Sequence, residues 1–165
     1  MKPADITMKS QTITKDKSTD QMIEFLKRAQ RIAEIGSWDW NIVDNTEHWS
    51  DEQFRIYGYE PLSVNPTHQL FIDSIHKDDK VRVLKAMDDI LSDDRSFDLE
   101  LRIHCNEGQL KWIHSQGSVY RDDNGVPIRM VGTMQDITNR KFTNKLDNNL
   151  SEQKLLLSDT ILKNI

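Results

Sequence analysis

The feature that most constrains the fold is a change of hydrophobic period in the last third of the chain. Residues 97–105 alternate between apolar and polar side chains, which is typical of a β-strand with one buried face. The segments 106–108 (Asn-Glu-Gly) and 123–125 (Asp-Asn-Gly) are hairpin signals, and they delimit two further strand-like segments at 110–121 and 127–137. The pattern predicts a three-stranded antiparallel meander.

An earlier part of the chain predicts two more strands. Residues 37–43 alternate, with Trp38 and Trp40 on one face, and residues 47–49 follow after a turn. Between the two groups of strands, apolar residues recur at helical spacing, most clearly over residues 79–92. This order predicts an α+β fold, in which helices cover one face of a five-stranded antiparallel sheet.

Two helical segments flank the predicted sheet. Residues 1–17 are polar and show no apolar period, so we expect them to be disordered. Residues 18–35 have the spacing of an amphipathic helix, which Gly36 would cap. A domain over residues 36–138 and a helical linker over residues 139–165 complete the expected organisation. The linker carries an imperfect heptad seam, typical of a short coiled coil, at Leu146, Leu150, Leu157 and Ile161.

The outer face of the sheet is expected to need a cover. The second and third strands of the meander carry apolar side chains on both faces, whereas a sheet with one wet face alternates more cleanly. The N-terminal helix is the candidate cover, contributed by the same chain or by a partner, and we expect a homodimer. The candidate dimer face comprises Met22, Phe25, Leu26, Ala29, Trp112 and Met130.

Charge and cysteine content narrow the classes of partner. The net charge is −5 with acidic and basic residues interspersed, so we expect no nucleic-acid partner. The single cysteine, Cys105, excludes a disulfide within the chain and fits a reducing cytoplasm. No apolar run is long enough to cross a membrane, so we expect a cytoplasmic segment without membrane contact.

The sequence carries no catalytic motif. It contains no Gly-rich phosphate loop, nucleophile elbow or zinc-protease signature, so we expect no enzymatic activity in this chain. The carboxylate pair Asp78 and Asp79 is interpreted as the cap of a helix rather than as an acid–base pair. The five histidines are scattered, and only His104 and His114, on neighbouring strands, are expected to meet. No metal site is therefore predicted.

A small-molecule pocket is expected between the sheet and the middle helices, where concave apolar space can form. The sequence leaves open whether side chains fill this space, since the same aromatic residues are typical of a packed core. The candidate pocket residues are Trp40, Phe54, Tyr57, Phe71, Leu84, Met87 and Leu101.

Five short words occur in order along the chain: 35–41 (Ile-Gly-Ser-Trp-Asp-Trp-Asn), 56–59 (Ile-Tyr-Gly-Tyr), 76–79 (His-Lys-Asp-Asp), 100–103 (Glu-Leu-Arg-Ile) and 136–138 (Asp-Ile-Thr). Their succession resembles PAS domains of the subfamily with a Gly-x-Trp-x-Trp start and an Asp-Ile-Thr end. The resemblance covers roughly residues 30–140. Lys77 departs from the family pattern, which usually has Pro at that place.

The resemblance implies a sensing or dimerising module in a larger signalling protein, such as a histidine kinase, a cyclic-dinucleotide enzyme or a transcription regulator. Residues 151–165 resemble the helix that opens a following PAS domain, so we expect a fragment with a downstream effector domain. Flavin-binding relatives carry a reactive cysteine in an Asn-Cys-Arg word, and haem-binding relatives carry a histidine on the long helix. Neither occurs here, so the cofactor stays unknown, with no residue that indicates flavin, haem or metal.

The resemblance also gives a role to the junction Asp136-Ile137-Thr138, which the family uses to pass signals to the following helix. The residues fit this role, since Thr138 can cap the helix while Asp136 ends the last strand and can pair with Arg140 or Lys141. The predicted function is a sensory module that passes a change induced by a small-molecule ligand or a partner through this junction. The alternative is a ligand-free module for dimerisation or protein docking.

Overall fold

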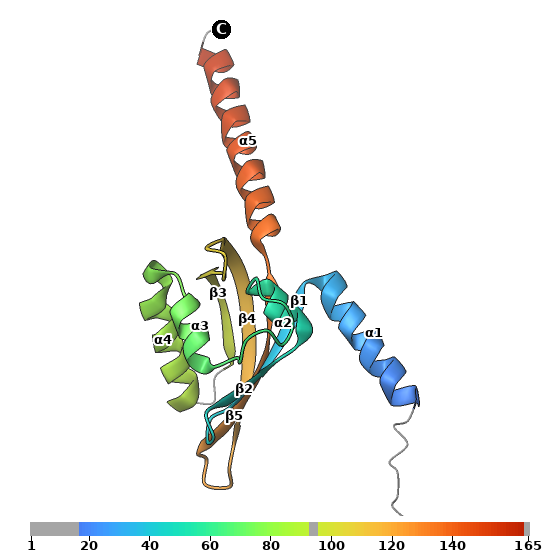
Figure 1. Ribbon diagram of the computed structural model, residues 1–165. Coiled ribbons are helices and arrows are strands. Elements are labelled where there is room, and N and C mark those ends of the chain that lie inside the picture. The colour runs from blue at the N-terminus through green and yellow to red at the C-terminus, as the bar shows by residue number, and fades with distance from the viewer. Residues whose placement is uncertain (1–16, 93–95, 164–165) are drawn as a thin grey trace, which may run out of the picture.

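The elements follow one another in the order that the hydrophobic periods predict (Figure 1). The computed structural model describes residues 17–92 and 96–163, without the side chains of residue 17 and residues 157–163. The elements are α1 (Lys17–Ala33), β1 (Ile35–Asn41), β2 (Thr46–Trp49), α2 (Asp51–Ile56), α3 (His68–Ser74), α4 (Lys77–Ser92), β3 (Phe97–His104), β4 (Leu110–Arg121), β5 (Pro127–Asp136) and α5 (Thr138–Lys163). The segment expected to be disordered lies outside the described residues except for Lys17, and so do the side chains of Leu157 and Ile161.

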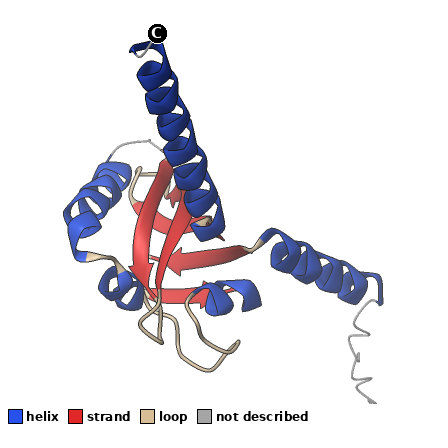
Figure 2. Ribbon diagram, turned by 90° about the horizontal axis from the view of Figure 1, so that it is seen from above, coloured by secondary structure: helices blue, strands red, loops and turns tan. Residues whose placement is uncertain are grey.

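The five strands form one antiparallel sheet (Figure 2), and their order in it is β2-β1-β5-β4-β3. The meander of β3, β4 and β5 joins the early strand pair because β1 pairs with β5, where Trp38 lies opposite Gly132. Gly108 and Gly125 have φ values of 77° and 81°, which explains why glycine occurs in both hairpin turns. The predicted α+β fold with a five-stranded antiparallel sheet is confirmed.

Helices α2, α3 and α4 lie against one face of the sheet and enclose the core with it (Figure 1, Figure 2). On β3 the inward side chains of Phe97, Leu101 and Ile103 are buried, as the alternating pattern predicts. Val83 and Ile90 belong to the buried face of α4. Burying each such side chain stabilises the fold by about 1.5–3 kcal/mol, so this contact holds the helical layer on the sheet.

The capping role expected for Asp78 or Asp79 falls to His76. The backbone N–H of Asp78 donates to Nδ1 of His76 at 3.3 Å. The carboxylate of Asp79 instead accepts from Arg102, from its backbone N–H at 2.9 Å and from its guanidinium at 2.9 and 3.0 Å. These bonds attach α4 to β3, and they hold the pKa of Asp79 below its usual range.

Gly36 is not the C-terminal cap of α1, as the sequence suggested. Glu34 adopts the left-handed conformation after the helix, with a φ of 52°, and Gly36 lies buried within β1. A Cβ atom at Gly36 would lie 2.3 Å from Oε1 of Gln53. Glycine is therefore required by the close approach of α2 to β1, a contact that local sequence patterns do not reveal.

The outer face of the sheet is more polar than expected, and α1 does not cover it. Helix α1 contacts β1 and α2 and otherwise extends away from the sheet (Figure 1, Figure 2). Trp112 faces outward between Arg102 and Lys141, whose cationic groups lie 5.4 and 4.9 Å from its ring. Met130 lies opposite Trp40 and is 1% exposed, so it faces the core and cannot belong to a dimer face.

The other candidates for the dimer face lie together on α1, where their side chains are exposed: Met22, Phe25, Leu26 and Ala29. Their spacing of three and four residues puts them on one side of the helix. None of the helices in the described part of the chain has both the length and the apolar character that a membrane crossing requires.

Candidate functional site

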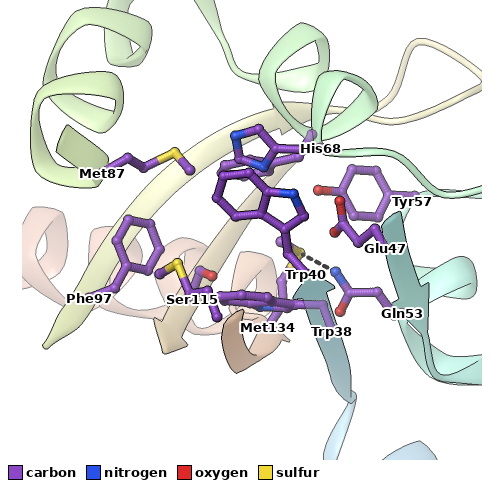
Figure 3. A pocket seen from close by; sticks show the side chains of 12 residues that line it. Trp38, Trp40, Glu47, Gln53, Tyr57, His68, Met87, Phe97, Ser115 and Met134 are labelled. Atoms are coloured by element: carbon purple, nitrogen blue, oxygen red, sulfur yellow. Dashed lines mark hydrogen bonds between the residues drawn. The ribbon is translucent and has the colours of Figure 1, made fainter. Parts of the chain in front are cut away.

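A small cavity lies between the inner face of the sheet and the helices that cover it (Figure 3). Its volume is about 30 Å³, which is room for about two water molecules. The strands contribute Trp38, Trp40, Glu47, Phe97, Ser115, Met130 and Met134 to its wall. The helices and their ends contribute Gln53, Tyr57, His68, Phe71 and Met87.

Two stacked rings close one side of the cavity. The imidazole of His68 lies parallel to the indole of Trp40, with 3.8 Å between ring centroids and 5° between the planes. Nε1 of Trp40 donates to Oδ1 of Asn45 at 3.2 Å, which holds the indole in place. Burial lowers the pKa of His68, so its ring is neutral at neutral pH. The pair forms an aromatic lid, which any ligand larger than the cavity would have to displace.

Buried polar groups face the cavity beside its apolar wall. Oε1 of Glu47 accepts from Nε1 of Trp49 at 2.7 Å, whereas Oε2 has no hydrogen-bond partner among the described residues. The hydroxyl of Tyr57 is buried near Ser74 without a well-formed hydrogen bond. The Glu47 carboxyl and the Tyr57 hydroxyl point into the same space (Figure 3).

Burial determines the protonation of both groups. It raises the pKa of Glu47 to about 7, so the carboxyl is partly protonated at neutral pH. Burial also raises the pKa of Tyr57, and the nearby Glu47 charge adds to this effect. An unpaired buried polar group costs about 1–3 kcal/mol, so a hydrogen-bonding ligand would be stabilised at this place.

Four of the seven predicted pocket residues line the cavity: Trp40, Tyr57, Phe71 and Met87. Phe54 and Leu101 are buried in the core but do not line the cavity. Leu84 is 41% exposed, because the inward side of α4 passes through Val83 and Met87 instead.

The sequence prediction missed the polar side of this site. Glu47 lies two residues before Trp49 on β2. Since residues two apart share one face of a strand, the apolar Trp49 could have indicated that Glu47 lies on the inner face too. His68 begins α3 and stacks on Trp40 across 28 positions of the chain, a contact without any local signal.

The junction between β5 and α5 is tied to the neighbouring strand β4. The backbone N–H of Trp112 donates to Oγ1 of Thr138 at 3.0 Å, and the N–H of Ile137 donates to the carbonyl of Trp112 at 2.9 Å. The carboxylate of Asp136 accepts from the N–H of Thr138 at 3.0 Å. Asp136 therefore bonds the first N–H of the helix, and Thr138 anchors the helix to the sheet.

Ion pairs extend this attachment, with partners that differ from the expected ones. Asp136 pairs with Nζ of Lys111 at 3.2 Å, and neither Arg140 nor Lys141 reaches it. Both of these residues bind Glu100 on β3, Arg140 at 2.8 Å and Lys141 through a short contact. The hydrogen bond from Lys141 lowers the pKa of Glu100. The first turn of α5 is thus held by β3 as well as β4.

The end of α1 meets the same junction. The N–H of Asp136 donates to the carbonyl of Glu34 at 3.2 Å, and Nε2 of Gln135 donates to the carbonyl of Ala33 at the same distance. The helix that enters the sheet and the helix that leaves it are therefore bonded to adjacent residues of β5.

The remaining candidates for chemistry are separate from the cavity. Cys105 is buried, its thiol donates to the carbonyl of Ile56 at 3.2 Å, and burial raises its pKa. His104 stacks on His76 rather than meeting His114, which pairs with Asp98 at 2.6 Å. Across residues 17–92 and 96–163, no three His, Cys, Asp or Glu side chains gather as metal ligands would.

Comparisons with known proteins identify the family. A family model described as the PAS fold matches residues 46–134, more than half of the chain. A sensory box histidine kinase/response regulator from Burkholderia thailandensis has a similar solved structure, with 32% identity and a TM-score of 0.66 over 79% of this chain and 96% of that one. The N-terminal domain of a diguanylate cyclase with PAS/PAC sensor from Marinobacter aquaeolei shares the fold, at 18% identity and a TM-score of 0.59 over 65% of this chain and 98% of that one.

A curated relative agrees with these matches. The sensor protein FixL of Bradyrhizobium diazoefficiens is 26% identical over 110 residues, which make up 65% of this chain. The chain spans 21% of the length of that relative. The family match runs from β2 through the helical layer to β5, so it includes most of the cavity wall. The chain belongs to the PAS fold family, whose members are sensory modules of signalling proteins.

Proposed function

We propose that this PAS domain senses a small molecule in its cavity and passes the resulting change to α5 through Asp136, Ile137 and Thr138. One observation carries the proposal. Strand β5 supplies Met130 and Met134 to the cavity wall and reaches the junction two residues after Met134. A shift of this wall therefore has a short and rigid route to the first turn of the output helix.

The neighbouring strand supports the same route. On β4, Ser115 lies opposite Met134, and Ile113 lies opposite Asp136. Ser115 lines the cavity, while Trp112, one residue beyond Ile113, bonds Thr138 and Ile137. Two adjacent strands thus connect the cavity to α5. The ligand acts as a switch only if it binds two arrangements of these strands with unequal affinity.

The output of the switch would lie in an effector domain of the same polypeptide. The similar proteins include a sensory histidine kinase and a diguanylate cyclase, which supports an effector of one of these classes. Any catalytic activity would then belong to the effector, and we propose that this domain acts in the cytoplasm.

The direction of α5 is the quantity that tests this proposal. Spin labels at Asn124→Cys, in the β4–β5 hairpin, and at Asn149→Cys, on α5, report it by double electron–electron resonance in a Cys105→Ala background. Met134→Val alters the cavity wall of β5, and Ile90→Val is the matched control in the buried face of α4. Each change costs about 1 kcal/mol, so both variants remain folded.

We expect Met134→Val to shift or broaden the distribution of distances between the labels, because β5 leads directly into α5. Ile90→Val should leave the distribution unchanged, since Ile90 does not line the cavity. Equal distributions for wild type and both variants would refute the coupling. An equal disturbance by both variants would refute the specific role of β5.

A second candidate function rests on α1. Its apolar side chains Met22, Phe25 and Leu26 are exposed, and a stripe of this kind is typical of a helix that packs against a partner. We infer that α1 supports a homodimer, as the alternative or companion of ligand sensing.

A further inference from the structure

The Glu47 carboxyl is an unusual component of the cavity. It is the acidic side chain in a wall made mostly of aromatic and thioether groups, and its Oε2 atom has no partner among the described residues. None of the described residues that line the cavity is Lys or Arg. A buried carboxylate without a counter-charge is costly, so the ionised form of Glu47 needs a positive charge that this wall does not supply.

The surroundings of Glu47 favour a particular kind of positive charge. The rings of Trp38, Trp40 and Tyr57 line the cavity together with the carboxyl (Figure 3), and Phe71 belongs to the same wall. Aromatic faces attract cations, more strongly when water is excluded, and ammonium groups are the usual ligands of such arrangements. The Tyr57 hydroxyl adds a second acceptor that points into the same space.

We propose that the cavity binds a small monovalent ammonium-type cation, whose N–H groups donate to the Glu47 carboxylate and the Tyr57 hydroxyl. The inference rests on the proposed function, which requires a ligand in this cavity. The volume of about 30 Å³ suits ammonium or methylammonium, and a larger amine would have to displace the lid formed by Trp40 and His68.

A neutral ligand would use the same group in the opposite protonation state. Protonated Glu47 would donate to a carbonyl or a similar acceptor, and such binding would strengthen as the pH falls. Cation binding requires the carboxylate, so it strengthens as the pH rises through about 7. Among the described residues that line the cavity, the other titratable groups are His68 and Tyr57, and both are neutral from pH 7 to 8. Protonation of His68 below this range would oppose a cation and reinforce the same trend.

The first experiment titrates the wild-type domain with methylammonium chloride by calorimetry at pH 6, 7 and 8. Potassium chloride at equal ionic strength and methanol serve as the charged and neutral controls. We expect the affinity to rise about tenfold from pH 6 to pH 8, because the ionised fraction of Glu47 rises by that factor. At pH 7, heats in two buffers should report release of roughly half a proton per cation bound.

The second experiment compares Glu47→Gln with Glu107→Gln, which removes an exposed carboxylate from the β3–β4 hairpin. We expect Glu47→Gln to abolish methylammonium binding and Glu107→Gln to keep it. Absence of binding by the wild type, equal binding by Glu47→Gln, or methanol binding that strengthens at low pH would overturn the proposal. The wild-type pH series decides the question independently of either variant.

Failure of this inference differs from failure of the proposed function. If methylammonium binds but leaves the distances between the labels on β4–β5 and α5 unchanged, the cation site stands and the coupling fails. If no cation binds while Met134→Val still shifts α5, the coupling stands and the cation site fails.

Discussion

Glu47 lies on the edge strand β2, yet its carboxyl group lines an apolar cavity and makes a single hydrogen bond, to Trp49, within the described part of the chain. This placement makes one residue responsible for a distinct pH response of the whole fold. A carboxyl whose pKa is raised from 4.5 to about 7 binds its proton more tightly in the folded state than in the unfolded state. The fold is therefore favoured by protonation of Glu47.

The sign of this effect gives a residue-scale prediction. The contribution of Glu47 to the free energy of unfolding is fully present below pH 4.5 and is lost as the pH rises through about 7. The loss amounts to roughly 3 kcal/mol at most. We expect Glu47→Gln to remove this decline, so the variant should be more stable than the wild type at pH 8, as measured by urea denaturation.

The other groups with shifted pKa values titrate in the opposite direction or, like Tyr57 and Cys105, above pH 8, so the comparison with wild type isolates Glu47. Asp39 and Asp79 have lowered pKa values because of their arginine partners. Their contributions to the free energy of unfolding are lost only as the pH falls below about 4. Burial lowers the pKa of His68, so its contribution to the free energy of unfolding is lost as the pH falls below 6.5, in the wild type and in Glu47→Gln alike. Parallel stability curves for wild type and Glu47→Gln from pH 5 to 8 would contradict the prediction.

Among the elements, α5 depends on its first turn for attachment, because nearly all its later described side chains are exposed. Glu100 on β3 binds Arg140 and Lys141 in that turn, while Asp98 on the same face of the strand binds His114 and does not touch the helix. These two carboxylates form a matched pair for a test of the attachment.

We expect Glu100→Gln to weaken the docking of α5 by about 0.5 kcal/mol, the usual contribution of an exposed ion pair. The distance distribution between the labels at residues 124 and 149 should broaden, whereas Asp98→Asn should leave it unchanged. Salt at 1 M should broaden the wild-type distribution in the same way, since it screens exposed charges. A narrow distribution for Glu100→Gln would show that Thr138 and Trp112 alone hold the helix.

The elements also show what the sequence could predict and why. The β3–β4–β5 meander follows from local signals, since alternation places Phe97 and Leu101 inward and the turn glycines need positive φ values. The faces of β5 could not be assigned locally, because Met130 and Val131 are both apolar. Met130 faces the core because it pairs with Trp40 on β1, which lies 90 positions earlier in the chain.

The candidate site divides in the same way. Trp40, Tyr57, Phe71 and Met87 were recognisable as apolar residues of the two layers that face each other. The ion-pair partners of charged side chains could not be recognised from the sequence. Asp136 pairs with Lys111 because of the register of β4 against β5 and the direction in which α5 leaves the sheet.

At the scale of the whole molecule, α1 and α5 extend from a compact domain and expose apolar side chains (Figure 1). Phe25 on α1 is 65% exposed and Phe142 on α5 is 63% exposed. The two phenylalanines therefore offer the same substitution at equal exposure on different helices.

We expect Phe25→Glu to convert a homodimer into a monomer, because it puts a charge into the apolar stripe of α1. Phe142→Glu should keep the dimer, and light scattering coupled to size exclusion distinguishes the two masses. A dimer that survives Phe25→Glu and dissociates with Phe142→Glu would assign the interface to α5 instead. A monomeric wild type would refute the homodimer.

The bonds from Asp136 and Gln135 to the end of α1 have a mechanical consequence. Rotation of α1 would reach the last residues of β5, two positions before α5 begins, without passing through the cavity. Under the proposed function, α1 and the cavity would then act as two separate inputs to the same output helix, α5. If several such domains were joined end to end, rotation of one linking helix could be transmitted through each domain to the next helix. A ligand bound in one domain would change how readily that domain transmits the rotation.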